Sequence, residues 1–178
     1  MKLHLHLGVL FFGMLFSLSS VSCAPATNKP IPLASFSENY VNVSISLERN
    51  TGGESYLSGT FTPPEGYHLY SKDIPMNGVD GLGRPTLLEL TPESQMKVVG
   101  DLQESVEPEE PDFEPKELLV YPAGAVTLSL PVELPPGKGW TQAEVKITYM
   151  VCSANQCKPP VEGKLVSVRI PGAEMLEH

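Results

Sequence analysis

Two cysteines near the C-terminal end of the chain are the residues best suited to chemistry. Cys152 and Cys157 have four residues between them in the run ITYMVCSANQCKPP. The segment that precedes them, AEVKITYMVC, alternates apolar and polar residues with the period of a half-buried strand. This alternation places Cys152 on the polar, outward face of the strand, which is not where a disulfide of the core would lie.

The segment after the cysteines, KLVSVRI, alternates in the same way and predicts the partner strand of a hairpin. Its pattern places Cys157 on the same outward face. If residues 153–156 form a loop, the two cysteines lie directly opposite each other. Directly opposed residues have Cβ atoms about 4.5–5.5 Å apart, whereas a relaxed disulfide has a mean near ~3.8 Å. We therefore expect a bond that is easily reduced and that stabilises the fold by only about 2 kcal/mol.

The cysteine segment resembles a known family. The run YMVCSANQCKPP, with GYHLYS upstream and LPVELPPG before the cysteine strand, is similar to the N-terminal periplasmic domain of DsbD-type thiol:disulfide interchange proteins, also called the disulfide bond corrector domain. The resemblance extends from about Ser35 to Ile170. It implies an immunoglobulin-like fold and a cysteine pair that passes electrons to periplasmic disulfide isomerases and related partners, including those of cytochrome c biogenesis.

The resemblance also implies roles for single residues. The second cysteine of the family's pair joins the partner, so Cys157 would attack the partner and Cys152 would resolve the mixed disulfide. Lys158 follows Cys157 directly, and its positive charge favours a thiolate there. His68 and Tyr70 belong to an aromatic segment that lies beside the cysteine hairpin in the family.

An acidic segment from Asp101 to Glu117 contains one aromatic residue, Phe113. Its charges predict a solvated loop, in which the ring has no periodic partner and must pack on another segment. In the family, an acidic residue followed by Phe forms a cap over the cysteines, and Asp112 and Phe113 match that pattern. Such a ring would exclude unsuitable thiols, and a nearby carboxylate would raise the cysteine pKa.

Soft-metal binding is another chemistry open to these residues. Met150 and His68, together with Cys152 and Cys157, supply enough ligands for a copper(I) site, although nothing in their spacing requires a metal. His68 is the only histidine of the predicted folded region, so a zinc site would also need a carboxylate. We predict no metal and no cofactor.

The beginning of the chain predicts export. Residues 1–22 contain the apolar run GVLFFGMLFSL, which suits a signal peptide and is too short to span a membrane. The run SSVSC allows two outcomes: Cys23 becomes a lipidated N-terminus, or ordinary cleavage takes place next to it. Lipidation would hold the domain at a membrane surface, and both outcomes place it in the periplasm.

The rest of the chain predicts an all-β protein. We expect a tether over residues 23–34, whose first residue, Cys23, is the lipidation candidate. A β-sandwich domain over 35–171 and a frayed tail over 172–178 follow it. Eighteen prolines and fifteen glycines favour strands and turns. Besides the cysteine hairpin, strands are predicted at residues 41–47, 56–61, 67–70, 86–90, 96–99, 117–121 and 126–132. This number of short strands favours an immunoglobulin-like sandwich.

The charge of the chain limits its partners. A net charge of -9 excludes nucleic-acid binding, which needs a basic face. The sequence has neither a membrane electron-transport segment nor a thioredoxin-like domain with a C-x-x-C motif, so electrons would come from another polypeptide. We expect a membrane thiol reductase or a thioredoxin-like protein as donor, and a periplasmic disulfide isomerase or another thioredoxin-fold protein as acceptor. The alternative is a non-catalytic β-sandwich lipoprotein with a structural disulfide.

Overall fold

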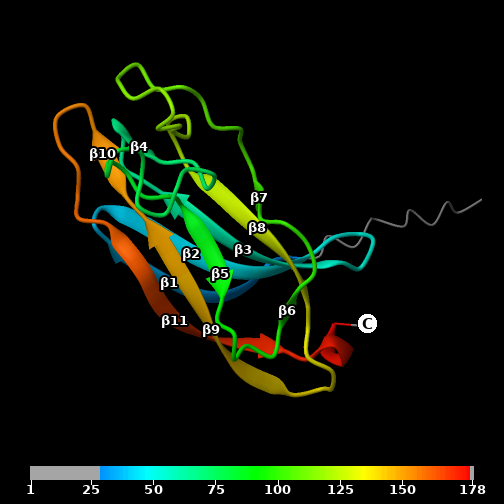
Figure 1. The fold of residues 1–178 in the computed structure, drawn as a ribbon. Coiled ribbons are helices and arrows are strands. Elements are labelled where there is room, and N and C mark those ends of the chain that lie inside the picture. Colours follow the sequence, from blue (N-terminus) through cyan, green and yellow to red (C-terminus); the bar gives the residue numbers. More distant parts are fainter. Residues whose placement is uncertain (1–28, 177–178) are drawn as a thin grey trace, which may run out of the picture.

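The computed structural model describes residues 29–176, so the predicted signal peptide and Cys23 lie outside the described part of the chain. The described residues form eleven β-strands and one 3-10 helix, η1, at Ala173–Met175, which confirms the all-β prediction (Figure 1). None of their helices is long and apolar enough to cross a membrane. The strands are β1 (Ile31–Glu38), β2 (Val41–Arg49), β3 (Ser55–Thr62), β4 (Tyr67–Leu69), β5 (Leu87–Leu90), β6 (Lys97–Val98), β7 (Gln103–Glu104), β8 (Val126–Glu133), β9 (Trp140–Tyr149), β10 (Val151–Ser153) and β11 (Val161–Pro171).

The strands form two sheets that face each other and a small third sheet. The larger sheet has the order β1-β2-β3-β8, with the short strands β6 and β7 both paired to the outer side of β8. The facing sheet has the order β11-β9-β5, and β10 pairs with β4 at one end of the molecule (Figure 1). This arrangement is an immunoglobulin-like β-sandwich, as predicted.

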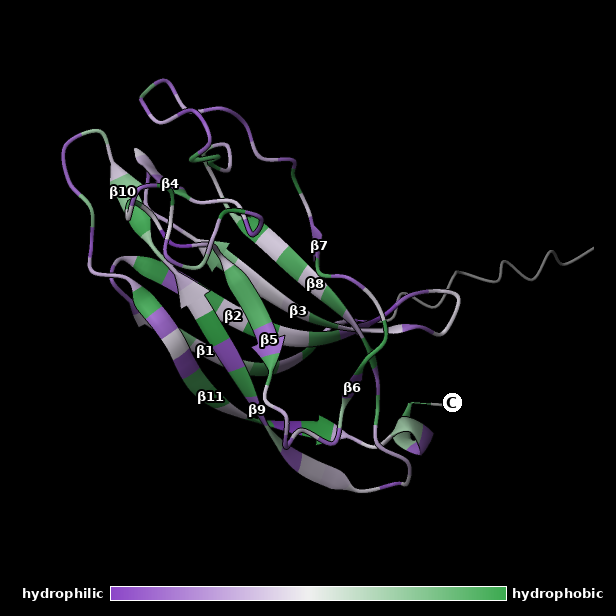
Figure 2. Cartoon of the chain, viewed as in Figure 1, coloured by the Kyte–Doolittle hydropathy of each residue, from purple (hydrophilic) through white to green (hydrophobic). Residues whose placement is uncertain are grey.

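Alternating strands supply the core between the two sheets. On β2, the residues Val41, Val43, Ile45 and Leu47 are each at most 1% exposed, and the polar residues between them are more exposed, as their pattern predicts. Figure 2 shows the alternation of apolar and polar residues along the strands. β8 and β9 alternate in the same way. Burial of each such side chain stabilises the fold by about 1.5–3 kcal/mol.

One buried tyrosine joins the two sheets near the cysteines. Tyr149 lies at the end of β9, and its ring packs edge-on against Phe61 of β3 at 5.8 Å. Its hydroxyl donates a 2.8 Å hydrogen bond to the carbonyl oxygen of Glu38 in β1. Burial raises the pKa of Tyr149, so the hydroxyl stays a donor. The end of the cysteine strand is therefore fixed to the sandwich.

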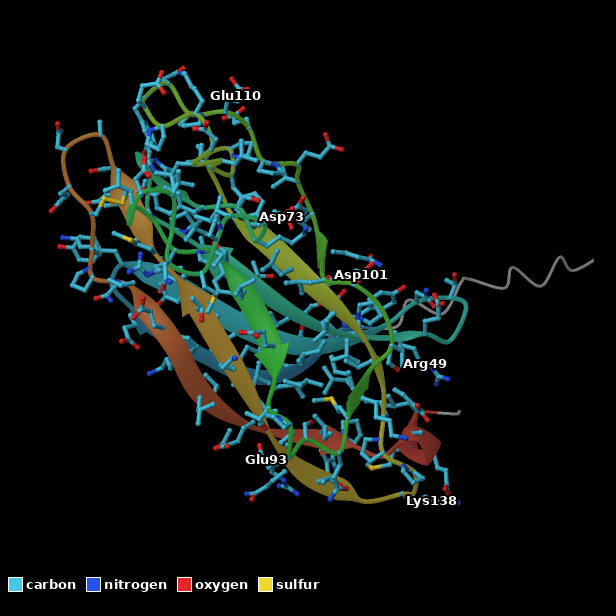
Figure 3. All side chains as sticks on the ribbon, in the orientation of Figure 1. Arg49, Asp73, Glu93, Asp101, Glu110 and Lys138 are labelled. Carbon is cyan, nitrogen blue, oxygen red and sulfur yellow. A yellow bond between two sulfur atoms is a disulfide. The ribbon has the colours of Figure 1, made fainter. Side chains whose placement is uncertain are left out.

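Three expectations about the fold differ from the structure. Residues 117–121 do not form a strand. Within this segment only Val120 makes isolated β-bridges, one to Tyr70 and one to Glu109. β1 begins at Ile31, so ordered structure starts inside the predicted tether. Within the predicted frayed tail, residues 173–175 form η1. Arg49, which Figure 3 labels, donates a hydrogen bond to the carbonyl oxygen of Leu176. The division of the chain into segments otherwise stays a prediction.

Candidate functional site

The two cysteines form a disulfide at the tip of the hairpin. Their sulfur atoms are 2.00 Å apart and their Cα atoms 4.0 Å apart. Backbone hydrogen bonds lie on either side of the pair: Ser153 donates to Gln156 at 2.8 Å, and Lys158 donates to Val151 at 3.0 Å. The cysteines are therefore a non-hydrogen-bonded antiparallel pair, the type in which opposed side chains come closest. The prediction that they lie directly opposite each other is confirmed.

The prediction that both cysteines lie on an exposed face is right for Cys157 and wrong for Cys152. Cys157 is exposed, whereas Cys152 is 2% exposed. Cys152 does point away from the main core, as the alternation requires, but other segments cover that side of the strand. There it packs in a second hydrophobic cluster with Tyr70, Ile74 and Leu118. The two cysteines therefore differ in their access to a partner.

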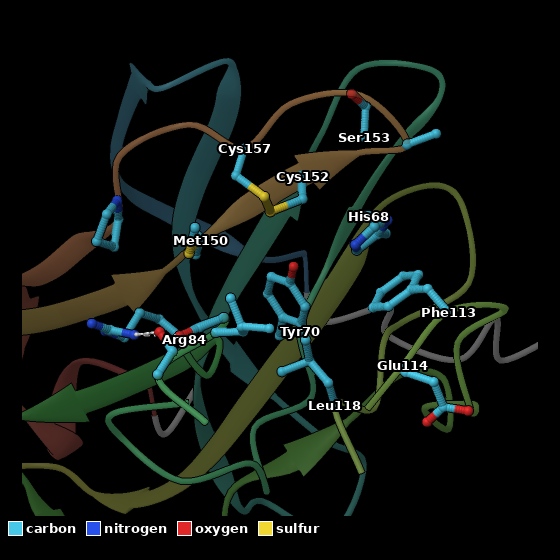
Figure 4. Close-up of a pocket in the computed structure, with 15 residues that line it drawn as sticks. His68, Tyr70, Arg84, Phe113, Glu114, Leu118, Met150, Cys152, Ser153 and Cys157 are labelled. Carbon is cyan, nitrogen blue, oxygen red and sulfur yellow. Dashed lines mark hydrogen bonds between the residues drawn. A yellow bond between two sulfur atoms is a disulfide. The ribbon is translucent and has the colours of Figure 1, made fainter. Parts of the chain in front are cut away.

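A row of aromatic rings lies beside Cys152. Cys152 in β10 is paired with His68 in β4, and Tyr70 follows on the same face two residues along the chain. The rings of His68 and Tyr70 make an edge contact at 5.3 Å. The ring of Phe113 lies against the other side of the row, 5.6 Å from His68 and tilted by 30° (Figure 4). The structure thus brings together three residues that the sequence analysis selected.

The disulfide lines a pocket of about 370 Å³ together with this aromatic row. Its remaining wall includes Leu118, Met150 and Arg84 (Figure 4). Of these three, the sequence alone had pointed only to Met150, as a possible copper(I) ligand. Arg84 is not a free cation, since its Nε atom is 2.5 Å from a carboxylate oxygen of Glu162. The pocket is therefore a mainly apolar recess that both cysteines line.

The cap segment differs from the prediction in its carboxylate. Phe113 is 39% exposed and lines the pocket, as expected of a cap. Asp112, however, lines a neighbouring hollow on the other side of the ring, with Glu109 and Glu110. Glu114 is the acidic residue that lines the disulfide pocket. Its place directly after Phe113 was the signal that could have identified it.

Lys158 is held by an aromatic residue that sequence reasoning missed. Its Nζ atom is 4.1 Å from the centre of the Tyr40 ring and donates a hydrogen bond to the Gln156 side chain at 3.1 Å. Tyr40 occupies the turn between β1 and β2 with a positive φ of 71°, which is rare for an aromatic residue, and is 58% exposed. The contact stabilises the hairpin by about 0.5–1 kcal/mol. The proposed effect of Lys158 on Cys157 stays a prediction.

His68 lies in an environment that disfavours the charged form of its imidazole. Burial lowers the pKa of its imidazole below the ordinary value. Its Nε2 atom is buried and has no hydrogen-bond partner among residues 29–176. Met150 and the cysteines line the same pocket, but in this part of the chain no three His, Cys, Asp or Glu residues are arranged to hold a metal ion.

A glycine in the pocket wall leaves the space that two neighbouring side chains of the pocket occupy. Gly83 has a φ of +74°, and a Cβ atom there would lie 2.7 Å from Leu118 and 3.2 Å from Tyr70.

Gly83→Ala should therefore displace both of these side chains. Gly81→Ala is a matched control, because Gly81 has a φ of +81° and a Cβ atom there would have nothing within 4 Å. We expect both variants to lose about 1–2 kcal/mol in urea unfolding from the backbone alone. Only Gly83→Ala should lose more and alter the rate of disulfide reduction; equal losses would contradict a packed pocket base.

Fold and site together define a β-sandwich domain with a disulfide in an aromatic pocket. Residues 37–168 match the family described as "Thiol:disulfide interchange protein DsbD, N-terminal", and the chain therefore belongs to this family. Among solved structures, the reduced form of the Neisseria meningitidis DsbD N-terminal domain is similar at 16% sequence identity, over 80% of this chain and 85% of that one, with a TM-score of 0.42. Comparison with curated proteins gave no match.

Proposed function

We propose that this domain is an exported thiol:disulfide interchange module that reduces partner proteins through the Cys152–Cys157 pair. Family membership supports the reaction class. The observation that carries the proposal is the unequal exposure of the two cysteines, because Cys157 is open to a partner while Cys152 is enclosed directly behind it. That asymmetry suits one thiol that attacks and one that resolves.

The reaction proceeds in two exchanges. The thiolate of Cys157 attacks a sulfur of the partner disulfide, forming a mixed disulfide and releasing the second partner sulfur as a thiolate. Cys152 then attacks the Cys157 sulfur, which forms the intramolecular bond seen in the structure and releases the first partner sulfur. Two electrons and two protons pass from the domain to the partner. No metal or cofactor is needed.

The proposed reaction needs a donor and an acceptor in the same compartment. The domain, once oxidised, needs a donor, for which we propose a membrane thiol reductase or a thioredoxin-like protein. The acceptor would be a periplasmic disulfide isomerase or another thioredoxin-fold protein, because the Cys157 thiolate can attack the reactive disulfide of such a protein. The apolar recess that both cysteines line would receive the surface around that disulfide. Lipidation of Cys23 would keep the domain at the membrane next to its donor.

The reduction potential tests this function. If the bond works in exchange, it should be reduced at a potential well above about -300 mV, the limit below which structural disulfides lie. The oxidised protein is equilibrated with glutathione or thioredoxin buffers, and the free thiols are counted by alkylation and mass. A bond that resists both buffers while the fold is intact would favour the alternative, a non-catalytic β-sandwich lipoprotein.

A further inference from the structure

The residue opposite Cys152 suggests which group accepts the thiol proton of Cys152. In the second exchange Cys152 must lose a proton, yet it is 2% exposed and packed among apolar groups. A thiol in apolar surroundings has a raised pKa and little thiolate at neutral pH. Water reaches it poorly. The resolving step is therefore slow unless a protein group accepts the proton.

His68 is placed to accept it. The residue is directly opposite Cys152 in the β4–β10 pair, where side chains on one face have Cβ atoms about 4.5–5.5 Å apart. Both residues line the same pocket (Figure 4). Tyr70 and Phe113 contact the imidazole at 5.3 and 5.6 Å and hold its orientation. Its buried Nε2 atom has no hydrogen-bond partner among the described residues, so a lone pair or proton there is uncommitted.

None of the charged groups around the imidazole forms an ion pair with it among the described residues. Burial is the cause that lowers its pKa. Tyr70 faces it from its own strand and Cys152 from β10. The remaining charges line the two hollows that border the ring: Glu109, Glu110 and Asp112 on one side, and Glu114 with the paired Arg84 on the other. In its uncharged form, which burial favours, the imidazole is a base that can take up one proton.

We propose that His68 is the proton-transfer group of this site, an inference that rests on the proposed function. It accepts the thiol proton of Cys152 as the Cys152 sulfur bonds to the Cys157 sulfur. The bond between Cys157 and the partner sulfur breaks, and the partner sulfur leaves with the electron pair. His68 then delivers the proton to this thiolate. One disulfide forms as one breaks, and no further reactant is consumed.

A two-step exchange with oxidised glutathione tests the proposal. Reduced protein carrying Cys23→Ala is mixed with oxidised glutathione, quenched with acid, and the mixed disulfide and final disulfide are followed by mass. His68→Gln keeps a polar side chain but removes the base. At pH 7 its resolving step should be roughly 100-fold slower than in the parent, the lower range for general base catalysis, so the mixed disulfide accumulates. Attack by Cys157, measured in a Cys152→Ala background, should keep its rate.

The pH dependence separates proton transfer from a structural role. As the pH rises toward the raised pKa of the Cys152 thiol, more of this thiol ionises without a protein base, so the ratio of the parent's resolving rate to that of His68→Gln should fall. Equal slowing of both steps, or a constant rate ratio across pH, would overturn the proposal. So would a resolving step that His68→Gln leaves unchanged.

A second measurement uses the unmodified site. The imidazole of His68 is titrated by NMR in the oxidised and reduced protein, and its titration should shift on reduction because a thiol then faces it. An identical titration in both states would overturn the inference even if exchange takes place. If the parent fails to react with glutathione, the proposed function fails, and the titration still decides whether the two groups share a proton.

Discussion

A Cys152→Ala variant should accumulate a stable mixed disulfide through Cys157, whereas a Cys157→Ala variant should trap little. Cys157 lies exposed at the hairpin tip, but Cys152 is 2% exposed and is enclosed by the second hydrophobic cluster. Attack by Cys152 on a partner would first require that cluster to open. An opening that costs about 1.4–2.8 kcal/mol makes trapping 10- to 100-fold lower.

The experiment needs both single variants and one background change. All proteins carry Cys23→Ala, because a third thiol could form mixed disulfides of its own. Each is incubated with an oxidised thioredoxin-fold protein, and the complexes are separated without reductant. The double variant Cys152→Ala with Cys157→Ala gives the background. Trapping mainly through Cys152 would mean that the roles of the cysteines are reversed, even if interchange itself takes place.

Removing the cap ring should open the site to small thiols. Phe113 lines the disulfide pocket and packs on His68, so access requires this contact to break. A contact between two rings contributes about 0.5–1.5 kcal/mol, and its loss in Phe113→Ala should speed entry about 2- to 10-fold. The measured rates are reduction of the bond by dithiothreitol and alkylation of the reduced cysteines.

Two further variants make this result specific. Trp140 is 48% exposed at the opposite end of β9, so Trp140→Ala removes an exposed ring without touching the pocket. It should leave both rates unchanged. Phe113→Tyr keeps a ring over the disulfide and should behave like the unchanged protein. Rates that do not rise in a folded Phe113→Ala variant would remove the cap from the mechanism.

Sequence patterns predicted those parts of the fold that depend on local alternation. β2, β8 and β9 each bury one face of a regular strand, so period-two patterns located them. β1 was missed because its sequence, IPLASFSE, has an irregular burial pattern and a bulge between Pro32 and Ala34. The burial of Cys152 could not be predicted from its strand, since the covering residues come from distant loops such as that of Leu118.

The same distinction applies to the site. Aromatic residues beside the cysteines were predicted from the family resemblance, and the structure places His68, Tyr70 and Phe113 there. The resemblance identifies these three aromatic residues. Which of Asp112 and Glu114 lines the disulfide pocket depends instead on how the chain bends around Phe113. No periodic pattern in an acidic loop contains that information.

The small β4–β10 sheet has a consequence for repeated use. Regular pairing of the cysteine strand stops at Met150, between β9 and β10, so the disulfide belongs to the small sheet and joins residues of a single hairpin. Breaking the bond frees a short loop and leaves every hydrogen bond between the strands of the two large sheets in place. A bond that joined those sheets would loosen the core in each cycle. If the domain works in interchange as proposed, its core would keep these hydrogen bonds in both the oxidised and the reduced state.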